Sequence, residues 1–169
     1  MSQDPNEESA RAATSPRPTL DRNAYAFQTE VRVRLSETDA VGIVFFGSYS
    51  AYMDVGRMDY LNHLGLQRFG TGEGSGRVRD LIPGAVVGAT LEFKSPARYN
   101  DVLTVNTRIA HLGRTSYQFH FLIGQKRSRE IAALGTLTLV WLDDTWRPQP
   151  LPEEFTRVVR SFEGPNLSP

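Results

Sequence analysis

The stretch Ser36–Asn62, SETDAVGIVFFGSYSAYMDVGRMDYLN, decides the fold of this chain. It begins with a polar turn that contains Asp39 and Gly42, and a run of bulky apolar residues follows. From Gly47 onward the residues that recur in steps of three and four are Tyr49, Tyr52, Met53, Gly56 and Tyr60. This spacing is typical of one face of an α-helix. A carboxylate directly before such a helix lies near unpaired amide groups and a partial positive charge, so it is a candidate base or nucleophile.

The composition predicts one ordinary globular domain. The chain has 169 residues, of which 40% are apolar and 22% are charged, which suffices for one sizeable core but hardly for two. Nineteen basic residues balance nineteen acidic ones, so the net charge gives no reason to expect nucleic acid or a membrane surface as partner. The absence of cysteine excludes disulfides, thiolate metal ligands and a cysteine nucleophile.

The start of the chain and its central loop differ in composition from the rest. Residues 1–24 contain little to bury, and we expect a disordered tail there, followed by a folded domain over residues 25–163. The start of the chain lacks the basic and apolar parts of a signal peptide, and no segment is long enough to span a membrane. A cytoplasmic location is therefore expected. Leu64–Gly84 holds six glycines and predicts a long loop, either a functional lid or a disordered segment.

Five segments alternate apolar and polar residues as half-buried strands do. They are residues 27–35, 85–94, 102–111, 115–126 and 129–142, and a short helix is expected at 153–162. Short turns between the last strands favour antiparallel pairing. One helix and one antiparallel sheet form a core only if the sheet curls around the helix, so the predicted class is α+β. Such a sheet leaves open edges, which favours a homodimer or a homotetramer built as a dimer of dimers.

Several motifs in this order resemble a known family. Residues 31–61, VRVRLSETDAVGIVFFGSYSAYMDVGRMDYL, are similar to the opening motif of hotdog-fold acyl-CoA thioesterases of the 4-hydroxybenzoyl-CoA thioesterase type, including the Tol-Pal-associated branch. The positions that match the family pattern are Glu37, Asp39, Gly42, Val44, Phe45, Tyr49, Asp54 and Arg57. FKSPARYNDVL, LGRTS and WLDDTWRPQPLPEEF resemble later segments of the family, so the likeness covers roughly residues 28–158. Phe46 stands where the Tol-Pal-associated branch usually carries His and the 4-hydroxybenzoyl branch an aromatic residue.

The resemblance implies a hotdog fold, a five-stranded antiparallel sheet wrapped around one long helix, and hydrolysis of an acyl-CoA thioester. It implies that Asp39 is the catalytic carboxylate, whereas position alone favours a turn or helix-cap aspartate. We expect the backbone amides near Phe46 and Gly47 to polarise the carbonyl. Asp54 and Asp59 are rival carboxylates, and an i, i+3 pair with Arg57 is the structural alternative for Asp54.

Substrate binding is expected from one aromatic and two basic residues. Tyr49 and Phe46 are placed at the mouth of an acyl pocket for an aromatic or a short- to medium-chain group, although such a cluster also suits a core. Seven bases stand against one acid between Lys94 and Arg129, which suits either solvated strand faces or coenzyme A phosphates. By resemblance Arg114 is placed near those phosphates, and Arg98 is a second candidate.

Two other functions are weighed against hydrolysis. A non-catalytic module that binds acyl-CoA or acyl carrier protein would need no carboxylate at Asp39. A nucleic-acid-binding barrel is disfavoured by the zero net charge. The three histidines have no metal-ligand spacing, and the chain contains neither a phosphate loop nor a dinucleotide fingerprint, so neither a metal nor a cofactor is expected.

Overall fold

The computed structural model describes residues 17–66 and 84–167. Residues 1–16, which form most of the expected tail, lie outside this range, as do residues 67–83 of the expected loop. Within the described part of the expected tail, Arg22–Ala24 form a 3₁₀ turn (η1) capped by the Asp21 side chain. The Arg22 guanidinium donates to the carbonyl of Arg129 at 2.8 Å, which attaches this segment to the sheet.

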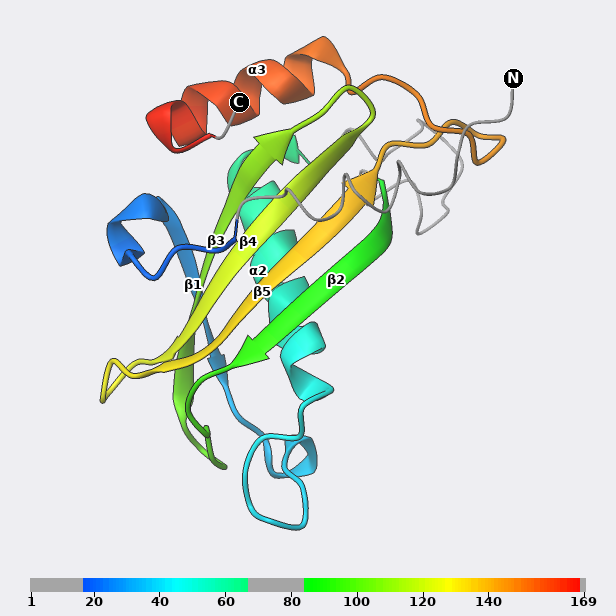
Figure 1. Ribbon diagram of the computed structural model, residues 1–169. Coiled ribbons are helices and arrows are strands. Elements are labelled where there is room, and N and C mark those ends of the chain that lie inside the picture. Colours follow the sequence, from blue (N-terminus) through cyan, green and yellow to red (C-terminus); the bar gives the residue numbers. More distant parts are fainter. Residues whose placement is uncertain (1–16, 67–83, 168–169) are drawn as a thin grey trace.

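A five-stranded antiparallel sheet and one long helix make up the fold (Figure 1). The strands are β1 (Phe27–Arg32), β2 (Ala85–Phe93), β3 (Val102–Leu112), β4 (Ser116–Gln125) and β5 (Ile131–Val140). Their spatial order is β1-β3-β4-β5-β2, so β1 and β2 are the edges. Helix α2 (Ser48–His63) runs along one face of the curved sheet, and α3 (Glu153–Glu163) lies at the end where β3 turns into β4. The predicted α+β sheet around a helix is confirmed.

The core lies between α2 and the inner face of the sheet. The alternating residues of β4 that point inward are Tyr117, Phe119, Phe121 and Ile123, all fully buried. On α2, Gly56 faces β3 so closely that an added Cβ would stand 2.6 Å from Thr107 Oγ1 and 2.7 Å from Val105 Cγ1. A glycine at this position is what allows the helix backbone to approach the sheet.

The first strand ends earlier than its alternation predicts. β1 stops at Arg32, and Leu35 is 70% exposed instead of facing the core. Residues Leu35–Glu37 form a 3₁₀ turn (η2), because the Glu37 carboxylate accepts from the Arg34 amide at 2.8 Å and closes the turn. This turn redirects the chain from the sheet edge toward the start of α2.

Candidate active site

The Asp39 turn is a small hairpin held against the helix start. Thr38 and Val44 form an antiparallel bridge, and the Asp39 amide donates to the carbonyl of Ile43 at 2.9 Å. Gly42 closes the turn with a φ of 82°, a conformation that suits glycine. Because the bridge ends next to Phe45, the carboxylate of Asp39 and the first residues of α2 belong to one compact unit.

The two oxygens of the Asp39 carboxylate differ in their surroundings. Oδ1 accepts from the amides of Val41 at 2.9 Å and Ile43 at 3.4 Å. Oδ2 has no hydrogen-bond partner within residues 17–66 and 84–167. The side chain is only half-buried. One oxygen therefore fixes the carboxylate to its turn while the other is available for a proton or for an attack.

The start of α2 offers two unpaired amides. The amides of Ser48 and Tyr49 donate to the carbonyls of Phe45 and Phe46 at 2.9 and 3.3 Å. The amides of Phe46 and Gly47 have no acceptor in the described part of the chain. Gly47 is the residue before the helix, so both groups lie where the helix dipole is positive. Two adjacent donors of this kind are a suitable site for a developing oxyanion.

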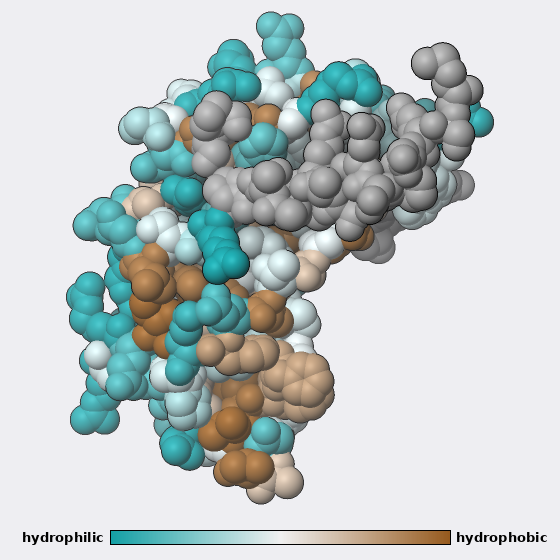
Figure 2. All heavy atoms as spheres, viewed as in Figure 1, coloured by the Kyte–Doolittle hydropathy of each residue, from teal (hydrophilic) through white to brown (hydrophobic). Residues whose placement is uncertain are grey.

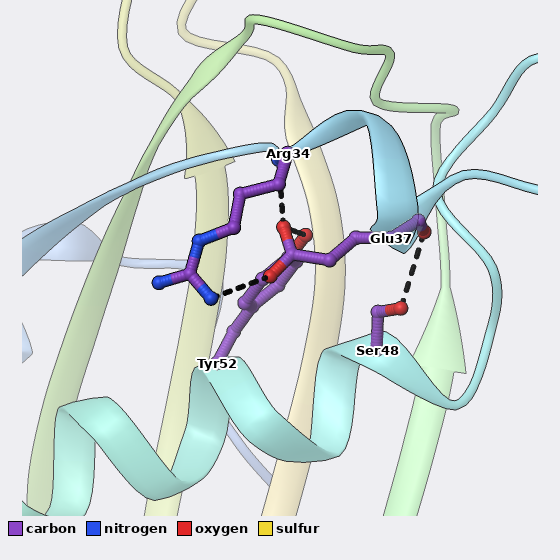
Figure 3. A network of polar contacts seen from close by, with 4 residues as sticks. All are labelled: Arg34, Glu37, Ser48 and Tyr52. Atoms are coloured by element: carbon purple, nitrogen blue, oxygen red, sulfur yellow. Dashed lines mark hydrogen bonds and ion pairs between the residues drawn. The ribbon is translucent and has the colours of Figure 1, made fainter.

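Glu37 joins the Asp39 turn to α2 (Figure 3). Its carboxylate accepts from the Tyr52 hydroxyl at 2.8 Å, and its backbone carbonyl accepts from the Ser48 hydroxyl at 3.1 Å and from the Phe45 amide at 2.8 Å. The pKa of Tyr52 is raised, mainly by burial and to a lesser extent by the hydrogen bond to the Glu37 carboxylate. No positioning role was predicted for Glu37, and Arg34 is not one of the Ser, Thr, Asp or Asn residues that announce a capped turn in a sequence.

Tyr49 lies in the core wall behind the helix start rather than free at a pocket mouth. Its side chain is 3% exposed, and its ring packs edge-on against Phe93 at 5.3 Å. Burial raises the pKa of the Tyr49 hydroxyl. Phe45, Phe46 and Phe93 are 45%, 65% and 50% exposed, so an apolar surface surrounds the two free amides. Figure 2 shows apolar side chains gathered at this end of the molecule.

The two expected arginines lie at opposite ends of the sheet. Arg98 pairs with Ile43 in an isolated bridge, which places it next to the Asp39 turn. Its side chain is exposed. Arg114 is in the turn between β3 and β4, at the other end of an 11-residue strand (Figure 1). At about 3.3 Å per residue this separation is roughly 35 Å. One protomer brings Arg98 to Asp39 but does not bring Arg114 there.

A cavity lies between the end of β1, the turn that follows it and α2. It has a volume of about 710 Å³, and its lining includes Val31 of β1, Val33, Glu37, and Tyr52 and Val55 of α2. Neither Asp39 nor Phe46 lines it. This cavity is therefore not the acyl pocket expected beside Phe46.

The rival carboxylates have structural partners. Asp54 is paired with the buried guanidinium of Arg57 at 2.5 Å, and Asp59 accepts from the Thr29 hydroxyl at 2.6 Å. Among the described residues no group of three histidine or acidic side chains could hold a metal ion. Likewise, no helix in the described ranges is long and apolar enough to cross a membrane.

A five-stranded antiparallel sheet curved around one long helix is the hotdog fold. The chain belongs to the thioesterase superfamily, whose family model matches residues 41–132. This confirms the family expected from the motif in Ser36–Asn62.

Two relatives and one solved structure are named as thioesterases or thioester hydrolases. The chain is 30% identical over 97 residues to the acyl-CoA thioester hydrolase YbgC of Escherichia coli O6:H1, covering 57% of this chain and 68% of that protein. It is 27% identical over 137 residues to the acyl-acyl carrier protein thioesterase ATL2 of Arabidopsis thaliana, covering 81% and 68%. A thioesterase from Thermus thermophilus, solved with coenzyme A and Zn, superposes with a TM-score of 0.69 at 27% identity, covering 83% and 97%.

Proposed function

We propose that this thioesterase hydrolyses acyl-CoA with Asp39 as the catalytic carboxylate and the amides of Phe46 and Gly47 as the oxyanion site. The observation that carries the proposal is the unit formed by the Asp39 turn and the helix start. Its carboxylate has a free oxygen, and the two adjacent amides have no acceptor among the described residues. The coenzyme A thioester is chosen because YbgC is named for that substrate, whereas ATL2 is named for acyl carrier protein.

The reaction requires a base or nucleophile on one side of the carbonyl carbon and hydrogen-bond donors at its oxygen. In the first route, Asp39 accepts a proton from water, hydroxide adds to the carbonyl carbon, and the negative charge on oxygen is held by the two amides. In the second, the Asp39 carboxylate attacks directly and water hydrolyses the resulting anhydride. In both, the C–S bond breaks, and the products are the free acid and coenzyme A thiol.

The exposed aromatic rings at the helix start suit the acyl end of the substrate. Phe45 and Phe46 pack against each other with centroids 4.4 Å apart, and the exposed ring of Phe93 packs on the buried ring of Tyr49 in the first turn of α2. An aromatic acyl group would stack on such rings, and a short or medium chain would lie against them. Arg98, beside the Asp39 turn, supplies a positive charge near the same place.

A homodimer formed through β2 would complete this site. β2 is a nine-residue edge strand with Val86, Val87 and Phe93 exposed at 48%, 61% and 50%, and such an edge favours pairing with a second copy. Antiparallel pairing of two β2 strands places the Ala85 end of one strand beside the Phe93 end of the other. Ala85 pairs with Val140, and Val140 also pairs with Ser116 near the β3–β4 turn. The partner's Arg114 would then approach the Asp39 end, in a dimer or in a tetramer of two such dimers.

Replacing Asp39 by Asn tests the catalytic assignment. The amide keeps an oxygen for the Val41 and Ile43 donors, so the fold should be unchanged while turnover of a panel of acyl-CoA substrates, measured by thiol release, falls by about 10³-fold or more. Asp54→Asn is the matched control and should keep turnover within about tenfold. An active Asp39→Asn protein would refute the assignment. An unaltered chain that binds acyl-CoA without hydrolysing it would instead indicate the non-catalytic binding module.

A further inference from the structure

The cavity between the end of β1, the η2 turn and α2, the β1–α2 cavity, has an apolar lining that stays accessible. Val31 is half-buried there, and three further apolar lining residues, Leu35, Val55 and Tyr99, are 70%, 39% and 58% exposed. The volume of about 710 Å³ lies within the range of sites that bind small molecules. Exposed apolar side chains around such a hollow are typical of a surface that takes a ligand.

The acids that line the β1–α2 cavity have partners within the fold. Glu30 forms an ion pair with Lys126 at 2.7 Å. The carboxylate of Glu37 accepts from the Tyr52 hydroxyl and from the Arg34 amide, both at 2.8 Å. Because both negative charges are engaged, they oppose the entry of an anion less than free carboxylates would.

The bases of the same lining are less well satisfied. Arg32 donates through Nη1 to Oδ1 of Asn100 at 3.0 Å and keeps an exposed side chain. Arg34 is 80% exposed, and its Nη1 lies 3.7 Å from Oε1 of Glu37, which is longer than a hydrogen bond. Counting Lys126, three bases stand against two acids around the cavity. An apolar hollow with a loosely held guanidinium at its side suits a molecule with an apolar body and one negative charge.

The proposed dimer leaves the β1–α2 cavity open. Its lining comes from β1, the turn after β1, α2 and the residues Tyr99 and Asn100, and none of it comes from β2. β1 and β2 are opposite edges of the sheet (Figure 1). A subunit that pairs through β2 therefore does not occupy this place.

Glu37 connects the β1–α2 cavity to the Asp39 turn. In Figure 3 the Arg34 guanidinium points to the Glu37 carboxylate from one side. On the other side, the backbone carbonyl of Glu37 accepts from the Ser48 hydroxyl at 3.1 Å and from the Phe45 amide at 2.8 Å. A ligand that takes Arg34 away from Glu37 thus acts on the residue that holds the start of α2.

We propose that the β1–α2 cavity is a second binding site for an amphipathic monocarboxylate, the free acid that hydrolysis releases, and that its occupation slows turnover. The identity of the acid rests on the proposed function. Its apolar part packs between β1 and α2, and its carboxylate binds the guanidinium of Arg34. Since the acid replaces Glu37 as the partner of Arg34, it displaces the turn that carries Asp39 and lowers kcat.

Methyl NMR of the unaltered chain shows where an acid binds. Decanoate is the probe, because it carries no thioester. On titration the methyl signals of Val31 and Val55 should shift, while those of Val87 on the β2 edge should not. Affinity should rise about two- to fourfold for each methylene added from hexanoate to decanoate, and decylamine, with the opposite charge, should bind about tenfold more weakly. Shifts at Val44, in the Asp39 turn, without shifts at Val31 and Val55 would overturn the inference.

An arginine substitution tests the partner of the carboxylate. Arg34→Gln keeps the backbone amide that closes the η2 turn, so the melting temperature should be unchanged while the affinity for decanoate falls about tenfold. Arg157→Gln is the matched control, because Arg157 is also exposed and lies 3.9 Å from Glu154, three positions earlier in α3. It should bind decanoate as the unaltered chain does. Equal affinity in the Arg34→Gln protein, or a cavity covered by a second copy of the chain, seen as concentration-dependent broadening of the Val31 and Val55 signals without decanoate, would refute the site.

Inhibition kinetics separate the β1–α2 cavity from the active site. Decanoate at the Asp39 site raises KM for an acyl-CoA and leaves kcat unchanged, whereas decanoate in the cavity should lower kcat about two- to tenfold. In the Arg34→Gln variant decanoate should no longer lower kcat. Purely competitive inhibition of the unaltered chain would overturn the regulatory effect. If the unaltered chain hydrolyses no acyl-CoA, the proposed function is wrong, and the NMR titration alone decides on the cavity.

Discussion

At the scale of single residues, Glu37 joins the Asp39 turn to the start of α2. It contacts Tyr52 through its carboxylate, and it contacts Ser48 and Phe45 through its carbonyl, so one residue bonds to the helix and to the segment that enters it. It does not itself reach the free amides at Phe46 and Gly47. In the proposed reaction its contribution would therefore be one of alignment.

Removing the Glu37 side chain should loosen this alignment without removing a reacting group. Glu37→Ala leaves the Tyr52 hydroxyl and the Arg34 amide without their acceptor, and a small displacement of the Asp39 turn would lower kcat about 10- to 100-fold with little change in KM. Steady-state kinetics and a melting curve check this. Glu37→Gln, which keeps a carbonyl oxygen for one of these donors, should retain most of the activity. If the glutamine variant is as inactive as the alanine variant, the charge of Glu37 itself takes part in catalysis.

At the scale of elements, the approach of α2 to β3 depends on Gly56. A methyl group at this position would stand well inside contact distance of Thr107 and Val105, and both belong to the rigid central part of the sheet. The helix cannot move outward locally without displacing the aromatic residues on either side of it.

Gly56→Ala should therefore destabilise the fold although alanine is the better helix former. The overpacking costs about 1–3 kcal/mol and the gain in helix propensity is about 1 kcal/mol, so we expect a net loss of up to about 2 kcal/mol in the free energy of unfolding. Urea denaturation measures it. Asn62→Ala, at an exposed position of the same helix, should be neutral or stabilising. An equally stable Gly56→Ala protein would mean that α2 lies farther from β3 than described.

The C-terminal helix α3 is attached to the core by a buried carboxylate. Glu163 is 1% exposed, and its Oε1 accepts from the Tyr60 hydroxyl at 2.6 Å and from the Ile109 amide at 3.0 Å. Burial raises the pKa of Glu163, and the two hydrogen bonds and the charge of Arg108 oppose this effect only in part. The folded state thus holds a proton on Glu163 more tightly than the unfolded chain does.

This raised pKa predicts a specific pH dependence of stability. Its contribution is fully present below the unfolded pKa of glutamate, about 4.3, and is lost as the pH rises through the folded pKa, at about 1.4 kcal/mol per unit of displacement. Glu163→Gln keeps an oxygen for both donors and has no charge to bury. The difference in unfolding free energy between variant and wild type should thus shift in favour of the variant from pH 4 to pH 7. A difference that is constant with pH would contradict the direction of the shift.

At the scale of the whole molecule, the open edge of β2 is where the proposed dimer would form. Burial along this strand is low, and its only charged residue, Glu92, is paired with Lys94. The exposed rings at the start of α2 continue the same apolar surface. A second subunit on β2 would cover both, and it would bring the Arg114 end of its sheet to the Asp39 end of the first.

A charge on this edge should separate the subunits. In the proposed dimer Val87→Lys would place two like charges across the two-fold axis, so light scattering should find the variant monomeric where the unaltered chain is dimeric, with a loss of about 100-fold in kcat/KM. Val55→Lys, which alters an exposed valine on α2, should remain dimeric. A Val87→Lys protein that is monomeric and fully active would show that one subunit contains the whole site.

The sequence by itself determined the class, the helix and the family. Helical and strand periodicity involve residues that are close in the chain, so they can be recognised from the sequence alone. The same holds for the spacing from Glu37 through Asp39 to Tyr49. Only the tertiary structure decided which distant residues meet. Strand order brings Arg98 to the Asp39 turn and leaves Arg114 at the far end, and the early stop of β1 turns Glu37 toward α2. Such contacts depend on the folding of segments far apart in the chain, which no local spacing encodes.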